Sequence, residues 1–276
     1  MLAALLITLR EGLEAALIVG IVIGYLKKIG YLDRQRYAWL GVLVALAGSV
    51  GLAFGLQRLG VELEGQVEQI FEGTTMFLAV IVLTWMIFWM RYQARFLKAG
   101  LERDVRQATL SGQNWGLFSL TFVAVFREGV ETALFLSAAA FANEGTTTLL
   151  GAVVGLVIAV ALGWAMYASA VRLNIRRFFD VTSVLLLLFA AGLLAQGVHE
   201  FQEAGLLPLM TTTVWDTSHI LSEESLIGSL LKSLFGYNAD PSLLEVLAYI
   251  GYYAIILSAI RWWIGRLAAR PAGAAP

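Results

Sequence analysis

Seven predominantly apolar stretches of this chain are each long enough to cross a lipid bilayer as a helix. They cover roughly residues 2–26, 37–57, 66–90, 115–141, 147–171, 179–201 and 242–264. About 20 helical residues cross the ~30 Å hydrocarbon core of a bilayer. Because lipid offers the backbone no hydrogen-bond partners, such stretches form helices. The sequence therefore predicts an all-α integral membrane protein with seven transmembrane helices, the first of which is retained rather than cleaved.

The composition supports this class and limits the chemistry. Of the 276 residues, 59% are hydrophobic and 14% are charged, whereas soluble domains are about 45–50% apolar and about 25% charged. The chain has no cysteine and two histidines. Thiolate metal centres and a catalytic thiol are therefore excluded, and a metal site must use mainly oxygen ligands, which hard cations prefer.

Basic residues gather in alternate connections. The loops after the first, third and fifth stretches and the C-terminal tail hold 15 of the 19 Lys and Arg residues. By the positive-inside rule, the N-terminus lies outside and the C-terminus is cytoplasmic. This rule accounts for the basic loops, which we expect to be short turns, without a nucleic-acid partner. The opposite loops are acidic, and a negative outer surface concentrates cations.

A ten-residue sequence with one arginine and two glutamates occurs twice, in the middle of the first and the fourth stretch. The copies begin at Arg10 and at Arg127, 117 residues apart, and six of their ten positions are identical. A charged residue at the centre of a membrane helix costs about 2.5–3.5 kcal/mol. Repeated charges at this depth indicate a functional site.

The two copies lie in helices 1 and 4, which cross the membrane in opposite directions because each unit of three helices contains an odd number of crossings. Helices 1–3 and 4–6 are therefore predicted to be inverted-topology repeats, with helix 7 added. The single transmembrane domain would comprise repeat one (about 1–92), repeat two (about 115–203), an outer loop with an amphipathic helix (204–240), helix 7 (about 241–264) and a flexible tail (265–276). In secondary transporters, inverted repeats place the substrate near the membrane midplane.

Helical geometry places the charges of each copy on one face. At about 100° per residue, Arg10, Glu14 and Glu11 fall near 0°, 40° and 100°. Two such faces that meet combine four glutamates with two arginines, a formal excess of two negative charges. A divalent or trivalent cation would largely neutralise this charge. We expect Gly12 and Gly129 to allow close approach between the glutamates.

Other interpretations of the motifs remain open. The charges are also compatible with a buried Arg–Glu network that only joins two helices, or with a proton relay that uses no metal. A membrane-embedded redox enzyme or sensor would hold iron that never crosses the membrane. A permease for another hard divalent cation, such as Mn²⁺ or Mg²⁺, would use the same oxygen ligands.

A second set of residues is predicted at the outer face. These side chains are candidate first ligands for an incoming cation, or solvated carboxylates without function: Glu68, Glu72, His199, Glu200, Glu203, Asp216, His219, Glu223 and Glu224. Apolar residues at helical spacing from Leu221 to Phe235, followed by Gly236, predict the amphipathic helix. Asp240 and Pro241 are predicted as the N-cap and first residue of helix 7.

The two motifs resemble the paired R-E-x-x-E motifs of the high-affinity iron permease family. They read Arg-Glu-Gly-Leu-Glu from Arg10 and Arg-Glu-Gly-Val-Glu from Arg127. This family includes the fungal ferric iron permease, which works with a multicopper oxidase, and the bacterial Efe-type permease. The resemblance covers most of the chain, and the short loops and tail are more similar to the bacterial branch. The acidic outer-loop motif of the fungal members is matched only loosely, by Glu223 and Glu224.

The resemblance implies an iron permease, not an enzyme, that imports Fe²⁺ or Fe³⁺ across the plasma membrane, here the bacterial inner membrane. Glu11, Glu14, Glu128 and Glu131 would be the metal ligands, and Arg10 and Arg127 would orient them. Iron would be the transported substrate, with no tightly bound cofactor. A periplasmic or extracellular iron-delivery protein, a peroxidase or a multicopper oxidase would be the partner, besides membrane lipid. The oligomeric state is not predicted.

Overall fold

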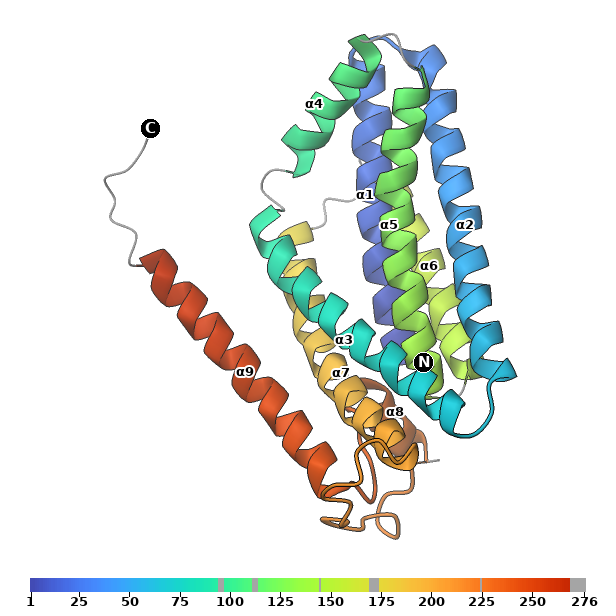
Figure 1. Cartoon of the computed structure of the whole chain (residues 1–276). Coiled ribbons are helices and arrows are strands. Elements are labelled where there is room, and N and C mark those ends of the chain that lie inside the picture. Colours follow the sequence, from blue (N-terminus) through green and yellow to red (C-terminus); the bar gives the residue numbers. More distant parts are fainter. Residues whose placement is uncertain (94–96, 111–113, 144, 169–173, 224, 269–276) are drawn as a thin grey trace.

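The computed structural model describes residues 1–93, 97–110, 114–143, 145–168, 174–223 and 225–268, and these residues form a bundle of helices (Figure 1). The helices are α1 (Leu2–Lys28), α2 (Gln35–Glu62), α3 (Gln66–Gln93), α4 (Leu97–Leu110), α5 (Asn114–Phe141), α6 (Gly145–Tyr167), α7 (Ile175–Glu203), α8 (Leu226–Phe235) and α9 (Leu243–Ala268), with a short 3₁₀ turn at Leu32–Arg34. Each predicted stretch corresponds to one long helix. The all-α fold class is confirmed.

Five of the long helices are apolar enough to span a membrane. Within the described residues, length and hydropathy select α3, α6, α7, α9 and the segment Leu32–Glu62, which contains α2. The remaining two long helices, α1 and α5, have 27 and 28 residues. They do not meet the same apolarity criterion because each carries an arginine and two glutamates near its middle.

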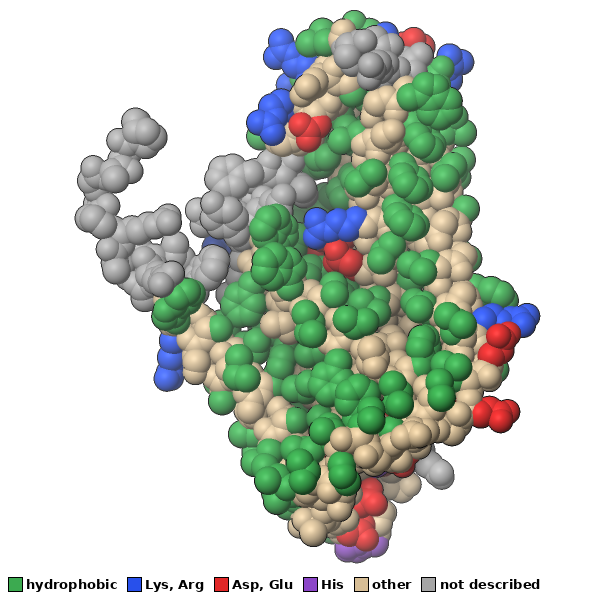
Figure 2. Space-filling view, in the orientation of Figure 1, with side chains coloured by type: hydrophobic (Ala, Val, Ile, Leu, Met, Phe, Trp, Pro, Cys, Tyr) green, Lys and Arg blue, Asp and Glu red, His purple; other side chains and the backbone are tan. Residues whose placement is uncertain are grey.

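The two ends of the bundle differ in charge, and we call them the basic end and the acidic end. At the basic end, α1 stops and α2 and α5 begin, near Lys27, Lys28 and Arg34. At the acidic end, α3 begins beside the end of α7, where Gln69 Nε2 donates to Glu203 Oε2 at 3.0 Å. Figure 2 shows Lys and Arg mainly towards the upper, basic end and acidic side chains with histidine at the lower end.

The α1 and α5 helices pack side by side in opposite directions. Ile7, near the start of α1, shares a buried cluster with Phe135, near the end of α5. Leu26, near the end of α1, shares a second cluster with Leu117, near the start of α5. This antiparallel arrangement places the middle of α1 next to the middle of α5, where the two charged motifs lie.

The α3 and α7 helices interlock through two glycine–phenylalanine contacts. A Cβ atom on Gly73 would lie 2.7 Å from the ring of Phe201, and one on Gly197 would lie 3.2 Å from the ring of Phe77. The two rings pack against each other with centroids 5.1 Å apart. Because each glycine accepts the ring from the other helix, α3 and α7 form a close pair along the acidic half of the bundle.

The connection between α3 and α5 is not the short turn that we expected. It contains the helix α4, which is 14 residues long and mostly polar. Its buried residues Leu101, Val105 and Thr109 recur at every fourth position and face the bundle at the basic end. Two buried apolar residues in a charged sequence gave too weak a periodic signal for a helix prediction.

Both predicted helix starts in the outer loop were wrong. The amphipathic helix α8 begins at Leu226 rather than Leu221, because Ser225 Oγ accepts the Gly228 N–H at 3.0 Å. It ends at Gly236, as predicted, with a φ of 65°. Helix α9 begins after Ser242 rather than after Asp240. Ser242 Oγ accepts the Glu245 N–H and Glu245 Oε1 accepts the Ser242 N–H, both at 3.3 Å, which is a capping box.

Candidate metal centre

The first motif is buried in the middle of α1. Arg10 is 0% exposed and Glu11 is 1% exposed, and Glu14 is also buried. Arg10 Nε lies 3.2 Å from Glu14 Oε1, so the predicted pair four residues apart is present. Arg10 Nη1 lies 4.0 Å from Glu11 Oε1. One guanidinium is thus shared by two carboxylates of the same helix.

The second motif forms the equivalent pair on α5. Arg127 Nε donates to Glu131 Oε1 at 2.9 Å. Glu128 is buried and Glu131 is partly buried. The two arginines differ, however, because the Arg127 side chain is 49% exposed. The similarity of the two motifs did not predict this asymmetry.

Three carboxylates from the two motifs converge. One oxygen from each of Glu11, Glu128 and Glu131 lies within 4.8 Å of the other two. This is the only group of three such residues with metal-ligand geometry among the residues that the structure describes. Glu14 lies outside this group, but it interacts electrostatically with Glu128 and Glu131.

The centre contains buried polar atoms that have no hydrogen-bond partner in the protein. They include both carboxylate oxygens of Glu11, Oε1 of Glu14 and Oε2 of Glu131. The guanidinium nitrogens of Arg10 also lack hydrogen bonds, although Nε is within ion-pair distance of Glu14. An unsatisfied buried carboxylate is costly. Such oxygens can bind a cation, which would offset this cost.

The two motif glycines do not face the opposing glutamates, so that prediction was wrong. A Cβ on Gly12 would lie 2.7 Å from Cβ of Ala159, on α6. A Cβ on Gly129 would overlap the side chain of Ser49, on α2. The glycines therefore allow α6 to approach α1 and α2 to approach α5. They allow close packing on the sides of α1 and α5 that contact α6 and α2, and they do not create space between the glutamates.

At the acidic end, three of the predicted outer carboxylates lie close together. Glu68 and Glu72 are on the first turns of α3, and Glu200 is near the end of α7. Electrostatic interactions connect Glu72 with both of the others. Glu200 is 8% exposed and accepts a hydrogen bond from Gln196 Nε2 at 3.4 Å. These carboxylates flank the contact between α3 and α7.

His199 points to a different set of partners. Its Nε2 lies 3.3 Å from Glu203 Oε1, and its Nδ1 lies 3.1 Å from Oε1 of Glu245 on α9. Glu245 is 3% exposed and also accepts from Asn238 Nδ2 at 2.8 Å. Glu245 was not among the predicted outer residues. The Ser242-x-x-Glu245 spacing is the signal that would have revealed it.

The remaining outer residues do not converge on a cation site. Asp216 accepts hydrogen bonds from the N–H and hydroxyl of Ser218, which lower its pKa, and both Asp216 and His219 are exposed. Glu223 accepts from Lys232 Nζ at 2.6 Å and from the Ala239 N–H at 2.9 Å, so both of its oxygens are engaged. Glu224 lies outside the described residues.

Comparison with known proteins gives one consistent result. The sequence profile of the Iron permease FTR1 family matches residues 1–267. The chain is 40% identical over 279 residues to the ferrous iron permease EfeU of Shigella sonnei (strain Ss046) and to that of Escherichia coli O157:H7, with 99% of this chain and 100% of each relative covered. It is 38% identical over 254 residues to the EfeU of Yersinia pestis, with 91% of this chain and 90% of the relative covered. No solved structure matches.

The family match and the apolar helices together define the class of protein. Relatives matched over their full length are named as ferrous iron permeases, one of them as an inactive one, so the chain is classed as an iron transporter and not as an enzyme. Iron is its substrate rather than a resident cofactor. Its multiple apolar helices place it in the bacterial inner membrane as a multi-pass protein. The chain belongs to the Iron permease FTR1 family.

Proposed function

We propose that the protein imports Fe²⁺ through a site formed by the glutamates of the two motifs. The observation that carries the proposal is the convergence of Glu11, Glu128 and Glu131, whose oxygens lie within 4.8 Å of one another. Several of these oxygens are buried and have no hydrogen-bond partner in the protein. Glu14 completes the set as a fourth carboxylate that reaches the ion when its pairing with Arg10 loosens.

The charge of the centre favours a divalent ion. Four glutamates and two arginines carry a formal excess of two negative charges. One Fe²⁺ neutralises this excess, which supports Fe²⁺ over Fe³⁺ as the transported form. The curated relatives are named ferrous iron permeases, which agrees with this choice. Arg10 and Arg127 orient the carboxylates and limit their repulsion before the ion arrives.

We propose that α1 and α5 also span the membrane, giving seven spans with the N-terminus outside. The charged motifs lie at the middle of both helices, where neighbouring helices bury Arg10, Glu11, Glu14 and Glu128. The basic end of the bundle would face the cytoplasm, in agreement with the positive-inside rule. The acidic end would face the periplasm and attract cations.

The arrangement of the motifs supports two inverted repeats. Rotation about a two-fold axis would exchange the two halves of the chain. Each residue of one motif would then take the place of the residue 117 positions away in the other motif. This exchange converts the pair Glu11–Glu131 into the pair Glu128–Glu14. It also converts the contact of α1 with α6 at Gly12 into the contact of α5 with α2 at Gly129. A quasi-two-fold axis between the motifs would therefore pass through the cation site, as in other inverted-repeat transporters.

The cluster of Glu68, Glu72 and Glu200 is proposed as the first contact of the incoming ion. It lies at the acidic end of the α3–α7 pair, where Glu203 and His199 are the other charged groups that interact with Glu200. A periplasmic delivery protein, peroxidase or oxidase would release iron near this cluster. Asp216 and His219 remain proposed contributors to capture in the outer loop, whereas Glu223 is already engaged with Lys232.

Uptake of radioactive Fe²⁺ by cells that lack other iron importers tests the function. We expect Glu14→Gln to lower uptake to the background of cells without the permease, whereas Glu62→Gln, at an exposed ion pair with Arg58, leaves uptake unchanged. Undiminished uptake in Glu14→Gln would contradict the proposal. Because Mn²⁺ prefers similar ligands, excess Mn²⁺ and Mg²⁺ are added in parallel. Stronger inhibition by either ion than by unlabelled Fe²⁺ would identify that ion as the substrate instead.

A further inference from the structure

The two arginines of the metal centre differ in their surroundings. Arg10 is fully buried, whereas the Arg127 side chain is 49% exposed. Val123, one turn before Arg127 on α5, is 64% exposed. Figure 2 shows a basic and an acidic side chain close together at mid-height on a face where hydrophobic side chains predominate. Arginines inside membrane segments almost always face protein or a water-filled cavity rather than lipid.

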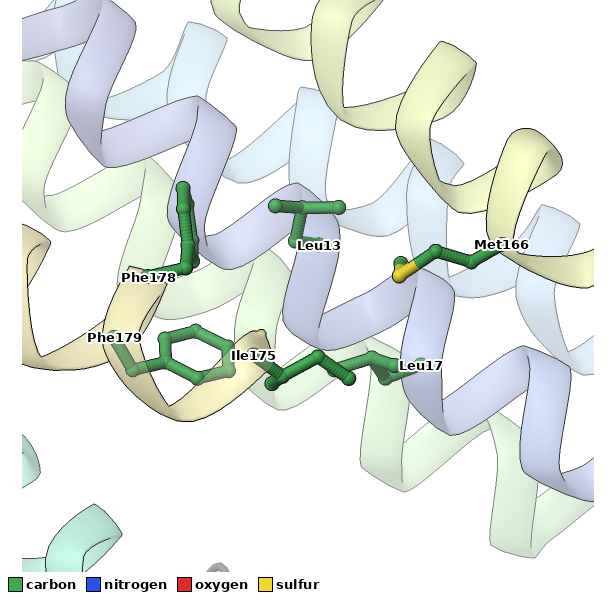
Figure 3. Close-up of a pocket in the computed structure, with 6 residues that line it drawn as sticks. All are labelled: Leu13, Leu17, Met166, Ile175, Phe178 and Phe179. Atoms are coloured by element: carbon green, nitrogen blue, oxygen red, sulfur yellow. The ribbon is translucent and has the colours of Figure 1, made fainter. Parts of the chain in front are cut away.

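The α7 helix explains why Arg10 is covered. Towards the acidic end, Ile7 of α1 shares the main buried cluster with Phe189 of α7. Towards the basic end, Leu13 of α1 lines a narrow apolar cavity with Phe178 and Phe179 of α7 (Figure 3). Because α7 lies against α1 on both sides of Arg10, it closes this half of the centre.

The α3 helix covers α5 only towards the acidic end. There, Phe71 of α3 packs against Phe141 of α5 with ring centroids 5.9 Å apart. Towards the basic end, the buried cluster around Leu26 and Leu117 contains residues of α1, α2, α4 and α5, and no described residue of α3 or α7 belongs to it. Figure 1 shows α3 diverging from α5 in the same direction. No described residue of α3 or α7 in these clusters therefore covers the side of α5 that carries Val123 and Arg127.

We propose that this structure is the inward-facing state and that the α3–α7 pair rocks against the other helices to alternate access. The proposal rests on the proposed function, because it deepens the mechanism of the same site. In this state an aqueous cleft along Val123 and Arg127 connects the glutamates with the basic end. In the opposite state α3 covers Arg127, and α7 withdraws from the first half of α1. Arg10 and Glu11 then become accessible from the acidic end.

The two repeats supply matched reporter positions. Leu6, which lies 117 residues before Val123, is partly buried against the main cluster. In the outward-facing state, Leu6 would take the exposed position that Val123 has here. Val50 of α2 is 69% exposed and serves as a control for exposure to lipid. Because the natural chain contains no cysteine, single-cysteine variants at these three positions need no altered background.

The experiment measures labelling of the full-length protein in proteoliposomes by a membrane-impermeant thiol reagent, added to one side at a time. We expect Val123→Cys to react from the basic side, and Val50→Cys to react at least tenfold more slowly despite its greater exposure. We expect Leu6→Cys to react slowly, and only from the acidic side. No reaction of Val123→Cys from the basic side, or equal rates for Val123→Cys and Val50→Cys, would overturn the proposed cleft.

A bulky group attached at position 123 then tests whether closure at this position is coupled to opening at position 6. In the double variant Val123→Cys/Leu6→Cys, a bulky reagent is first attached to position 123 from the basic side. If α3 must close over this position before α7 opens, labelling of position 6 falls at least fivefold. An unchanged rate at position 6 would overturn the rocking motion.

Iron uptake by the unlabelled single variants, measured in the same vesicles, separates this inference from the proposed function. Uptake without the predicted labelling contradicts only the inference. The predicted labelling without iron uptake contradicts the proposed function.

Discussion

Glu11 and Glu131 belong to antiparallel helices from the two halves of the chain, and their carboxylate oxygens come within 4.8 Å of each other. Each residue has at least one buried oxygen with no hydrogen-bond partner. Within each helix, the arginine pairs with the glutamate four residues later. The group of three carboxylates needs both helices, because Glu11 comes from α1 and Glu128 and Glu131 come from α5. The contact between α1 and α5 therefore turns two ion pairs into one candidate cation site.

The first prediction concerns metal binding by Glu11. The change Glu11→Gln keeps the shape of the side chain but removes a charge and a strong oxygen ligand. We expect the affinity of the purified protein for Fe²⁺ to fall by at least about tenfold, since even residues behind the ligands contribute about 10–100-fold. Equilibrium dialysis with quantification of bound metal provides the measurement. The control is Glu62→Gln, and equal affinities in the two variants would argue against Glu11 as a ligand.

The second prediction compares the two arginines. Lysine preserves the positive charge but cannot reproduce the planar guanidinium group. Arg10 is fully buried between two carboxylates. Arg127 is half exposed, so water can supply the hydrogen bonds that a lysine at this position would not make. We expect Arg10→Lys to reduce iron uptake more strongly than Arg127→Lys at matched expression. Equal loss in both variants would show that the difference in burial has no functional consequence.

The third prediction concerns the support of α5 by α2. A Cβ on Gly129 would overlap Ser49, so Gly129→Ala forces the helices apart. We expect a destabilisation of about 1–3 kcal/mol, which is typical of overpacking, seen as a lower midpoint of thermal unfolding in detergent. Addition of Ser49→Gly should restore part of the loss. Gly20→Ala is the control, because no atom lies within 4 Å of the added Cβ.

Features that depend on residues close together in the sequence could be predicted, whereas features that depend on contacts between distant helices could not. The long helices followed from local apolar runs, and the Arg10–Glu14 pair followed from helical spacing. The exposure of Arg127 did not, because it depends on where α3 diverges from α5. The partners of Gly12 and Gly129 likewise depend on which helices pack behind the motifs. At the start of α9, Asp240-Pro241 and Ser242-x-x-Glu245 were competing local signals, and only the folded loop decides between them.

The fourth prediction concerns pH and the outer loop. Burial raises the pKa of Glu223, but hydrogen bonds from Lys232 and from the Ala239 N–H outweigh this effect and hold the pKa below its ordinary value. A lowered folded-state pKa gives stability that is present above the ordinary value and is lost as the pH falls through the folded-state pKa. We therefore expect α8 to loosen as the pH falls below about 4.

A spin label on Ile227→Cys, an exposed position of α8, reports this change as increased mobility. With Glu223→Gln added, the ion pair with Lys232 is absent at every pH, so the label should already be mobile at pH 7. The assignment of Glu223 as the residue that holds α8 in place would be contradicted if the mobility of the label fell on acidification. It would also be contradicted if neither acidification nor Glu223→Gln changed the mobility.

The central claim is that iron crosses the membrane through the glutamates of the two motifs. Its most direct test is the accumulation of radioactive Fe²⁺ inside sealed proteoliposomes that contain only the purified protein. We predict that the natural protein fills the lumen faster than empty vesicles do, and that Glu131→Gln, reconstituted in equal amount, fills it at the rate of empty vesicles. Accumulation by Glu131→Gln at the natural rate, or none by the natural protein, would contradict the account.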